Sequence, residues 1–469
     1  MKIEQIYTGC LAQGAYYIVS ENEAVIIDPL RETQPYIDRA KQDNVRIKYI
    51  LETHFHADFV SGHLDLSKQT GATIVYGPNA DPSYPVHIAG DGEVLKVGKI
   101  SIKVLHTPGH TMESSCFLLF DENGKEYALF SGDTLFIGDV GRPDLAQKAA
   151  SITQEALAGL LYQSLRSKIM TLPDDVIVYP AHGAGSACGK NMSKETTDTL
   201  GNQKRTNYAL REEMTESDFI QEVTDGLLPP PAYFGMNVAL NKSGYDSYNA
   251  VLERGMKPLS IADFESIMNE PEILILDTRT ASDFATGFIP GSVSIGLEGQ
   301  FAPWVGALIP DIKQKIVLIT DVDKTEETIK RLSRVGYDNV IGYLEGGIET
   351  WKKDGKNLDT IERITTEELE KELAKDSLVF DVRKPGEYEA EHIENVPSIP
   401  LDFINEKMNL FPKNEPFILH CAGGYRSIIA ASILKSRGFN EVKDVIGGYS
   451  AIAKTNIART NFVCPTTLK

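Results

Sequence analysis

The sequence is poor in cysteine and has no long apolar run. Five cysteines in 469 residues are too few, and odd in number, for a disulfide framework, which indicates a reducing compartment where single thiols can react. No apolar run approaches the roughly 20 residues that a membrane span needs. The first residues also lack the basic and apolar segments of a signal peptide. We therefore expect a cytoplasmic protein that does not bind membranes.

Basic residues are also scarce relative to acidic ones. Lys and Arg number 47 and Asp and Glu number 66, which gives a formal net charge of −19. Such a chain repels the phosphates of nucleic acids and anionic membrane surfaces, so we expect no nucleic-acid partner. Hydrophobic residues make up 42% of the sequence, which is ordinary for a globular protein. At about 150 residues per domain, the length predicts roughly three domains.

The first part of the chain, to about residue 210, alternates short apolar runs with polar loops and helical patterns. This alternation predicts layered α/β structure, with a helix at 153–168. The expected strands are 24–28, 49–52, 73–76, 100–105, 128–130 and 176–179. Residues 215–256 become rich in Pro, Gly and Asn from Leu227 onward, so we expect an irregular connector that closes a first domain at residue 256.

The remaining half contains an internal duplication. The segment 276–279 (LDTR) recurs 104 residues later as 380–383 (FDVR), and at the same spacing 288–295 matches 392–399. The apolar run 316–320 recurs as 416–420, and the glycine pair 346–347 recurs as 447–448. Four blocks in the same order predict two copies of one domain, at 257–357 and 358–469.

Imidazole and carboxylate side chains gather in four short blocks of the first domain. The blocks are 53–63 (THFHADFVSGH), 107–111 (TPGHT), 130–134 (FSGDT) and 179–183 (YPAHG). Each block comes directly after a predicted strand, where strand ends present side chains to a common cleft. Imidazoles and carboxylates together suit a first-row divalent metal. The first domain is therefore expected to hold a metal site.

With these blocks in this order, the first domain resembles the metallo-β-lactamase superfamily in its glyoxalase II-like branch. The first motif of that branch, HxHxDH, builds a two-metal site, but Phe59 stands where the last histidine belongs. Because that position and Asp58 serve the second metal, the departure disfavours a binuclear zinc centre.

The ligands that remain are His54, His110 and Asp133. Two imidazoles and one carboxylate match the facial triad of mononuclear non-haem Fe(II) oxygenases. Within the superfamily this pattern resembles the persulfide dioxygenases, and the resemblance continues through 138–144 (GDVGRPD). It implies one mononuclear Fe(II) per chain. Three further residues are expected to orient these ligands or to hydrogen-bond the substrate: His56, Asp58 and His182.

A second site is expected in the last domain, where Cys421 follows a predicted strand and precedes a predicted helix at 427–436. Backbone N–H groups of the loop between them form an anion-binding concavity, and the helix dipole adds positive potential. Both favour the thiolate, which is the nucleophile, and Arg426 adds a cation. The expected cradle consists of Ala422, Gly423, Gly424, Tyr425 and Ser427.

Together with 380–388 (FDVRKPGEY), this loop resembles the rhodanese domains, which transfer sulfane sulfur through a cysteine persulfide. The family's catalytic cysteine falls on Cys421. The first copy keeps the framework, but its strand leads into 321–324 (DVDK), with no cysteine, no glycine cradle and two carboxylates where an anion should bind. We expect this copy to be an inactive rhodanese-like domain with a structural or dimerising role, with a binding role as the alternative.

The resemblance implies an α/β protein, with an N-terminal αββα metallo-β-lactamase sandwich followed by two α/β rhodanese-like domains with parallel sheets. It implies a bifunctional enzyme of sulfide detoxification. Fe(II)-dependent oxygenation by O₂ would convert a low-molecular-weight thiol persulfide to sulfite and thiol, and Cys421 would exchange sulfur among persulfide, sulfite and thiosulfate. We expect a homo-oligomer, either a dimer or a tetramer. Two alternatives stay open: a zinc-dependent thioester hydrolase with an appended sulfurtransferase, and a non-catalytic sulfur-binding or sensing protein.

Three further residues are weaker candidates. Cys188 lies six residues after His182, among small neighbours and close to Lys190. This setting predicts an accessible thiol that accepts or relays a persulfide, and a packed loop cysteine is the alternative. Arg142 and Arg205 are candidates for binding the acidic groups of a thiol carrier.

Overall fold

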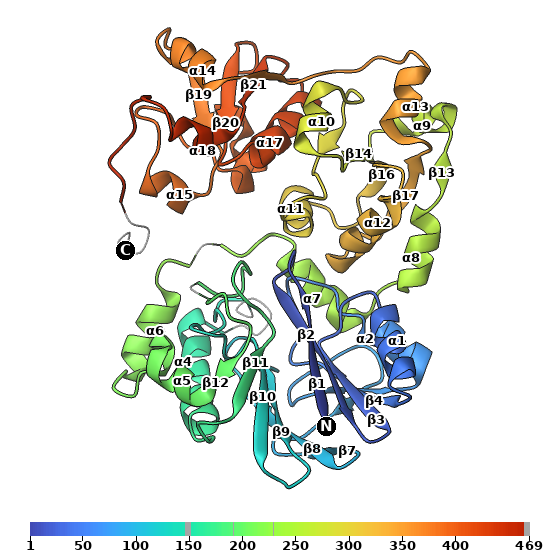
Figure 1. The fold of residues 1–469 in the computed structure, drawn as a ribbon, viewed down its shortest axis with the longest axis vertical. Helices are drawn as coiled ribbons and strands as arrows, with labels where there is room; N and C mark the ends of the chain where they lie inside the picture. Colours follow the sequence, from blue (N-terminus) through green and yellow to red (C-terminus); the bar gives the residue numbers. More distant parts are fainter. Residues whose placement is uncertain (146–151, 191, 228, 464–469) are drawn as a thin grey trace. The chain divides into compact units, whose positions relative to one another are not determined.

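The computed structural model describes residues 1–145, 152–190, 192–227 and 229–463, drawn as a ribbon in Figure 1. They divide into two compact units. Met1–Asn249 forms the first unit, and most of the chain from Ala250 onward forms the second.

Two six-stranded sheets form the centre of the first unit. The first sheet runs β1-β2-β3-β4-β5-β6 and the second runs β12-β11-β10-β9-β8-β7. The strands of the first sheet are β1 (Lys2–Thr8), β2 (Gln13–Ser20), β3 (Glu23–Ile27), β4 (Arg46–Leu51), β5 (Thr73–Tyr76) and β6 (His87–Ile88). Those of the second are β7 (Val94–Val97), β8 (Ile100–His106), β9 (Ser115–Phe120), β10 (Glu126–Gly132), β11 (Ile177–Pro180) and β12 (Asp198–Thr199).

The two sheets pack face to face over an apolar core, to which Val25 and Leu51 contribute from one sheet and Phe117 and Phe130 from the other. Helices cover the outer faces, which gives four αββα layers. The first sheet is covered by α1 (Gln34–Gln42), α2 (His63–Thr70) and α7 (Phe234–Ser243). The second is covered by α4 (Gln154–Ser164), η1 (Leu165–Ile169), α5 (Leu200–Thr206), η2 (Tyr208–Leu210) and α6 (Glu216–Thr224).

The sandwich confirms the expected layers, and each of the six strands and the helix expected from the sequence is present with its ends shifted by a few residues. The expectation of an irregular connector over 215–256 is wrong. This stretch contains α6, α7 and α8 (Tyr248–Gly255). Its prolines lie ahead of α7, which therefore starts unhindered, and α7 buries Phe234, Asn237 and Asn241 along one face at helical spacing.

The second unit contains two parallel sheets. The first runs β13-β17-β16-β14-β15 and the second runs β18-β21-β20-β19. Their strands are β13 (Pro258–Leu259), β14 (Ile273–Asp277), β15 (Val293–Ser294), β16 (Lys315–Ile319) and β17 (Val340–Leu344), then β18 (Glu362–Ile364), β19 (Leu378–Asp381), β20 (Phe417–His420) and β21 (Val442–Val445).

Short helices accompany both parallel sheets. Those of the first copy are α9 (Ile261–Met268), α10 (Ala281–Thr286), α11 (Phe301–Leu308), α12 (Thr325–Arg334) and α13 (Gly347–Lys353). Those of the second are α14 (Thr366–Leu373), α15 (Pro385–Ala390), η3 (Leu401–Phe403), α16 (Ile404–Lys407), η4 (Met408–Leu410), α17 (Tyr425–Ser436) and α18 (Gly448–Ile452). The expected helix at 427–436 is thus present as α17, which begins two residues earlier.

The duplication is visible in equivalent side-chain contacts. Arg279 forms an ion pair with Asp277, two residues before it, at 2.6 Å, and Arg383 pairs with Asp381 at the same distance. Each guanidinium also donates to a backbone carbonyl eight residues further along the chain. These buried braces fix the turn that follows β14 and β19.

The structure corrects the alignment of the two copies at one place. Asp277 pairs with Ile319 across the first sheet, and its equivalent Asp381 pairs with His420 across the second. Thr320, rather than Asp321, therefore occupies the position of Cys421. The sequence comparison placed Thr320 opposite His420 because the spacing between the copies is not constant along the chain.

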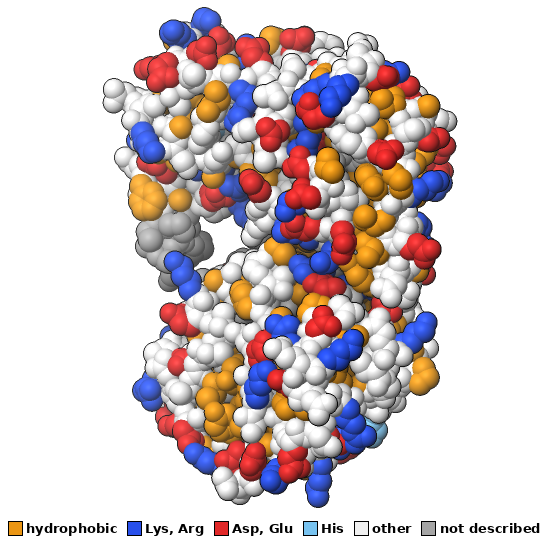
Figure 2. All heavy atoms as spheres, turned by 45° about the vertical axis from the view of Figure 1, so that its right-hand side comes forward, with side chains coloured by type: hydrophobic (Ala, Val, Ile, Leu, Met, Phe, Trp, Pro, Cys, Tyr) orange, Lys and Arg blue, Asp and Glu red, His pale blue; other side chains and the backbone are white. Residues whose placement is uncertain are grey.

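Among the described residues, no helix has both the length and the apolar character required to cross a bilayer. Acidic and basic side chains are interspersed over the face shown in Figure 2.

Candidate metal centre and sulfur-transfer site

The residues of the four predicted blocks lie at strand ends in the first unit. His54 follows β4, His110 follows β8, Asp133 comes directly after β10, and His182 lies two residues past β11. The carboxyl ends of these strands deliver one polar side chain each to one edge of the sandwich. All four side chains are buried, with at most 2% of each residue exposed.

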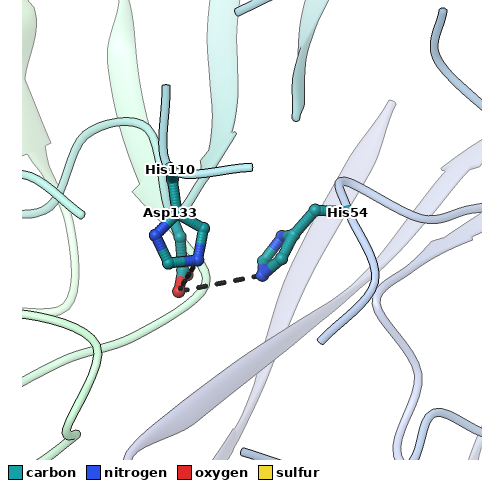
Figure 3. A group of neighbouring side chains, drawn as sticks. All are labelled: His54, His110 and Asp133. Atoms are coloured by element: carbon teal, nitrogen blue, oxygen red, sulfur yellow. Dashed lines mark ion pairs between the residues drawn. The ribbon is translucent and has the colours of Figure 1, made fainter. Parts of the chain in front are cut away.

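His54, His110 and Asp133 converge as the sequence predicts (Figure 3). Nε2 of His110 lies 3.4 Å from Oδ2 of Asp133, and Nε2 of His54 lies 3.8 Å from the same oxygen. Burial, together with the neighbouring imidazoles, holds the pKa of His54 well below its usual value. A neutral imidazole is the form that ligates a metal. We call this group the three-donor site.

Neighbouring groups set which nitrogen of each histidine faces Asp133. Nδ1 of His110 lies 2.9 Å from the carbonyl oxygen of Arg142, and Nδ1 of His54 lies 2.9 Å from Oγ1 of Thr53. Thr53 in turn donates to Asp28 at 2.9 Å. If each Nδ1 carries the proton, both Nε2 atoms keep free lone pairs, which is the usual arrangement around metal-ligating histidines.

The loop at 138–144 lies against the three-donor site, as expected. A Cβ atom on Gly141 would come within 1.9 Å of the carbonyl oxygen of Asp133 and within 3.0 Å of Nδ1 of His110. Only glycine at position 141 lets the loop lie this close to Asp133 and His110. The close packing brings the carbonyl of Arg142 to His110.

The donor set fits a divalent cation. Both carboxylate oxygens of Asp133 are buried and have no hydrogen-bond partner among the described residues. A buried carboxylate without a partner is costly, and a cation between the two imidazoles and Asp133 would satisfy it. The three-donor site is where the residues of this chain could hold the ion.

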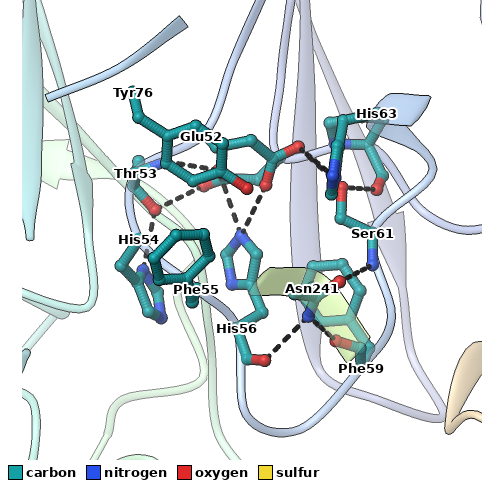
Figure 4. Close-up of polar contacts among 12 residues, drawn as sticks. Glu52, Thr53, His54, Phe55, His56, Phe59, Ser61, His63, Tyr76 and Asn241 are labelled. Carbon is teal, nitrogen blue, oxygen red and sulfur yellow. Dashed lines mark hydrogen bonds and ion pairs between the residues drawn. The ribbon is translucent and has the colours of Figure 1, made fainter. Parts of the chain in front are cut away.

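Nε2 of His56 faces two buried carboxylates and not the three-donor site. This nitrogen lies 3.1 Å from Oδ1 of Asp28 and 3.5 Å from Oε2 of Glu52 (Figure 4). Burial alone would lower the pKa of His56, but these two carboxylates outweigh it and raise the pKa well above its usual value. Phe59 stacks on the His56 ring with centroids 4.3 Å apart. An aromatic side chain without a donor atom thus lies at the position where the superfamily motif has a histidine.

Asn241 of α7 fixes this loop and was missed by the sequence analysis. Its amide nitrogen donates to the carbonyls of His56 and Phe59, both at 2.8 Å, and its amide oxygen accepts from the backbone N–H of Ser61 at 2.9 Å (Figure 4). One side chain therefore satisfies three backbone groups of the metal-motif loop. Asn241 is 185 residues from His56, so no local pattern could have identified it.

His182 and Asp58 lie on the other side of Asp133. Nε2 of His182 is 3.5 Å from Oδ1 of Asp133 and 3.6 Å from Oδ2 of Asp58. Burial raises the pKa of Asp58. His182 and Asp58 thus lie beside the three-donor site, and their expected role in orienting the ligands stays a prediction.

The expectation of an accessible Cys188 thiol is wrong. Cys188 is 1% exposed, and burial, followed by the charges of Asp133 and Asp58, raises its pKa well above the usual value. Lys190 does not assist it, because its ammonium donates to the carbonyls of Glu222, at 2.8 Å, and Asp225. The loop packs against the metal centre, which local composition does not reveal. A relay role for Cys188 stays a prediction.

Of the two arginines named as substrate-binding candidates, Arg142 is already engaged. Its guanidinium contacts both oxygens of Asp144, at 2.6 and 2.7 Å, and also donates to the carbonyl of Ala187. Its side chain therefore supports the structure of this loop, and the expected substrate contact stays a prediction. Arg205 is exposed on α5.

In the second unit, Cys421 lies between β20 and α17 and is 1% exposed. Its Sγ accepts the backbone N–H of Gly424 at 3.1 Å and lies 3.4 Å from the hydroxyl of Ser427. Gly424 has a φ of +99°, a conformation that side chains other than glycine rarely adopt. The loop thus curves around the sulfur, as the predicted cradle requires.

A buried polar cluster behind Cys421 was not predicted. The hydroxyl of Ser427 donates to Oδ1 of Asp444 at 2.5 Å, and Nε of Arg363 lies 2.9 Å from Oδ2 of the same carboxylate. Burial raises the pKa of Asp444 to about 6. Arg363 comes from β18 and Asp444 from β21, so the cluster exists only in the folded sheet.

Arg426 is not the free cation that the sequence suggests. Its two terminal nitrogens contact the two oxygens of Glu387, at 2.5 and 2.8 Å. Burial acts to raise the pKa of Glu387, but Arg426 outweighs it and lowers that pKa. The positive charge beside Cys421 is thus already paired.

A cleft of about 410 Å³ opens onto Cys421. Gln300 and Trp304, from the start of the first copy's α11, line it together with Lys384 and Arg426 of the second copy. The first copy, without a nucleophile of its own, therefore supplies part of the wall around the nucleophile of the second.

The sequence model of the Metallo-beta-lactamase superfamily matches residues 8–182, and that of the Rhodanese-like domain matches 260–354 and again 365–455. The chain therefore belongs to the metallo-β-lactamase superfamily and carries two rhodanese-like domains after its metal-binding domain.

Two curated relatives are similar to the first domain. The chain is 32% identical over 182 residues to a probable hydroxyacylglutathione hydrolase of Schizosaccharomyces pombe, and 35% identical over 177 residues to the mitochondrial persulfide dioxygenase ETHE1 of Homo sapiens. These alignments cover 38% and 37% of this chain but only 66% and 65% of the relatives, so it spans slightly less than two thirds of their length. A crystal structure of a metallo-beta-lactamase from Staphylococcus aureus subsp. aureus COL is 33% identical, with a TM-score of 0.65, over 73% of this chain and 98% of that one.

Proposed function

We propose that the protein is a bifunctional enzyme of sulfide detoxification, with an Fe(II)-dependent persulfide dioxygenase in the first domain and a sulfurtransferase in the last. The observation that carries the first half is the convergence of His54, His110 and Asp133. Phe59 offers no ligand atom, and His56 is directed to Asp28 and Glu52. Two imidazoles and one carboxylate are the usual ligand set of mononuclear Fe(II) oxygenases.

In the first reaction a thiol persulfide would react with O₂ and water to give thiol, sulfite and two protons (RSSH + O₂ + H₂O → RSH + SO₃²⁻ + 2H⁺). A ferrous ion at the three-donor site would supply the centre that activates O₂ next to the terminal sulfur. The residues of the chain orient the donors. Asp28 and Thr53 hold His54, the Arg142 carbonyl holds His110, and their burial limits access of bulk water.

In the second reaction the Cys421 thiolate would attack the terminal sulfur of a persulfide. The new S–S bond forms on Cys421, the old S–S bond breaks, and the carrier thiolate leaves (RSSH + Cys–S⁻ → RS⁻ + Cys–S–SH). After that persulfide loses its proton, its outer sulfur would pass to sulfite and release thiosulfate and the Cys421 thiolate. The Gly424 N–H is placed to stabilise charge on the sulfur.

The first half is tested by anaerobic reconstitution with Fe(II), followed by O₂ consumption and sulfite analysis with several thiol persulfides. We expect stoichiometric O₂ uptake and sulfite release, lost in His110→Ala. His106→Ala is the matched control, because the His106 ring bonds to the Met112 carbonyl and His106 lies four residues before His110. Activity that survives in His110→Ala would overturn the proposal.

The similarity to a hydroxyacylglutathione hydrolase favours one competing function, a zinc-dependent thioester hydrolase with an appended sulfurtransferase. Metal analysis after purification without added metal separates the two. About one zinc per chain, with thioester cleavage and no O₂ uptake, would mean that the first domain is a thioester hydrolase and not a dioxygenase.

A further inference from the structure

The hydroxyl of Ser427 lies between two acceptors, although it has a single hydrogen to donate. Its Oγ is 2.5 Å from Oδ1 of Asp444 and 3.4 Å from Sγ of Cys421. All three residues are buried, with at most 1% of each exposed. Because the group is shielded from bulk water, the charges on the two acceptors decide which of them receives the hydrogen.

The protonation state of Asp444 sets the direction of this hydrogen bond. As a carboxylate, Asp444 is the stronger acceptor and takes the hydrogen of Ser427, which leaves a lone pair of Oγ facing the sulfur. As a carboxylic acid, Asp444 donates to Oγ, and the hydroxyl of Ser427 is then directed to Cys421. The first arrangement favours the Cys421 thiol, and the second favours its thiolate.

The surroundings of Asp444 allow both of its protonation states. Burial raises the pKa of Asp444 to about 6, although Ser427 and Arg363 act to lower it. Arg363 of β18 bonds to Oδ2 at 2.9 Å, so Oδ1 is the oxygen left to carry a proton. On the neighbouring strand β20, His420 lies 3.8 Å from Asp381, and burial lowers the pKa of its imidazole. Asp444 therefore changes charge close to neutral pH, next to Ser427.

The charged groups in the cleft of Cys421 do not bond to this carboxylate. Arg426 of α17 pairs with Glu387 of α15 at 2.5 and 2.8 Å. Lys384 also lines the cleft. In the described part of the chain none of these three side chains bonds to Asp444, so the hydroxyl behind the sulfur is the direct link between Cys421 and the buried acid.

We propose that Asp444 is a positioning residue for Cys421, which acts through Ser427 and takes up the proton that the thiol releases. The S–H bond of Cys421 breaks as its proton moves to Oγ of Ser427, and the original hydroxyl hydrogen moves to Oδ1 of Asp444. The products are a Cys421 thiolate, an intact Ser427 hydroxyl and a neutral Asp444 carboxyl, so the net charge of the three groups is unchanged. The inference rests on the proposed role of Cys421 as the nucleophile of sulfur transfer.

The test is the pH profile of Cys421 alkylation by iodoacetamide in the full-length protein, measured by mass spectrometry of the peptide that contains Cys421. In Asp444→Asn the amide oxygen can still accept from Arg363, and the amide nitrogen donates to Ser427, which keeps that hydroxyl directed to the sulfur. We expect the midpoint of the profile to fall by about one pH unit, which makes alkylation about tenfold faster on the acidic side.

A double-mutant cycle separates this link from the charge of Asp444 alone. In a Ser427→Ala background, Asp444→Asn should change the alkylation rate by no more than about twofold, because the hydroxyl that connects the two groups is absent. Ser436→Ala is the matched control, since Ser436 belongs to the same helix and its hydroxyl donates to the carbonyl of Ile433 at 2.8 Å. Its profile should coincide with that of the wild type.

An equal effect of Asp444→Asn with and without Ser427 would overturn the proposal, as would an unchanged midpoint in Asp444→Asn. Alkylation needs no sulfur donor, so sulfur transfer from a persulfide is measured separately. A protein that shows the coupling between Asp444 and Ser427 but no transfer would contradict the proposed sulfurtransferase and leave the present inference supported.

Discussion

The two rhodanese-like copies have the same scaffold. They differ at the position of Cys421, in the loop that follows it and in the side chains beneath that loop. Both have a parallel sheet and a buried Asp–Arg brace after the equivalent strand. At the end of the next strand one copy has Cys421 and the other has Thr320, whose buried hydroxyl lacks a hydrogen-bond partner among the described residues. The rhodanese-like sheet therefore forms whether this position holds a cysteine or a threonine.

The loop after this position also differs in length. The backbone N–H of Tyr337 bonds to the carbonyl of Leu332, as that of Phe439 bonds to Leu434. The segment from Thr320 to Leu332 is thus one residue shorter than that from Cys421 to Leu434. The first copy thus has one residue fewer in this segment and carries Asp321 directly after Thr320.

The support behind the cradle differs as well. Asp444 pairs with Leu419 across the sheet, and Tyr343 pairs with the equivalent Leu318 in the first copy. An aromatic ring thus replaces the carboxylate that bonds Ser427 and Arg363. The two copies therefore share the parallel sheet and differ in the loop after the strand and in the buried side chains beneath that loop.

The largest effect is expected from the nucleophile itself. Cys421→Ser should lower sulfur transfer by about a thousandfold or more, because a serine hydroxyl cannot carry sulfane sulfur. Thr320→Cys should create no transfer in a Cys421→Ser background, since the shortened loop and Asp321 remain. Steady-state assays with a persulfide donor measure both. Transfer by the double variant would mean that the scaffold alone suffices.

The buried carboxylate should make the stability of the second copy depend on pH. The pKa of Asp444 is raised from 3.8 to about 6 in the folded protein. Between these values the folded state holds a proton that the unfolded state has lost, so stability falls as pH rises through this window. Native-state hydrogen exchange of β20 and β21 between pH 4 and 7 should show a loss of about 2 kcal/mol.

Asp444→Asn should remove this pH dependence, because the amide does not titrate. The equivalent strands β16 and β17, where Tyr343 replaces Asp444, serve as the internal reference. Identical pH slopes in the variant and the wild type would contradict the role of Asp444.

Substitution of the cradle glycine Gly424 should lower the transfer rate by a smaller but measurable factor than substitution of Cys421. Gly424→Ala places a Cβ at a φ of +99° and 3.2 Å from Nη2 of Arg363. The strain costs about 1–2 kcal/mol and would shift the N–H away from Cys421, so we expect roughly a tenfold loss of transfer rate. Gly386→Ala, where a Cβ meets nothing within 4 Å, is the matched control and should be neutral. Equal effects of the two substitutions would remove the special role of the cradle.

The smallest effect should come from the first copy. Trp304→Ala removes an indole from the wall of the Cys421 cleft and should raise the KM for an organic persulfide about fivefold. The KM for thiosulfate, which is too small to reach across the cleft, should stay within about twofold. An unchanged rate of Cys421 alkylation by iodoacetamide shows that the site is intact. Equal changes for both donors would mean that the first copy has no part in selecting substrate.

The convergence of His54, His110 and Asp133 and the place of Cys421 could be predicted, because each residue lies in a short motif after a strand, where sequence order and spatial position agree. Asn241, Arg363 and Asp444 could not, because they reach their partners from distant elements and their own neighbours carry no signal. The burial of Cys188 escaped prediction for the same reason, since small and polar neighbours looked like an exposed loop. Thr320 was misplaced by one position because the copies differ in loop length.

The hydrogen bonds of Asn241 to the metal-motif loop limit how the first domain can be transferred between proteins. The match to the superfamily's sequence model ends at His182, yet the side chain that holds His56, Phe59 and Ser61 comes from α7, beyond that limit. A fragment cut at His182 would contain His54, His110 and Asp133, but its metal-motif loop would have three unsatisfied amide and carbonyl groups. Gene fusion, recombination or laboratory excision should therefore preserve function only when the inherited segment runs through α7.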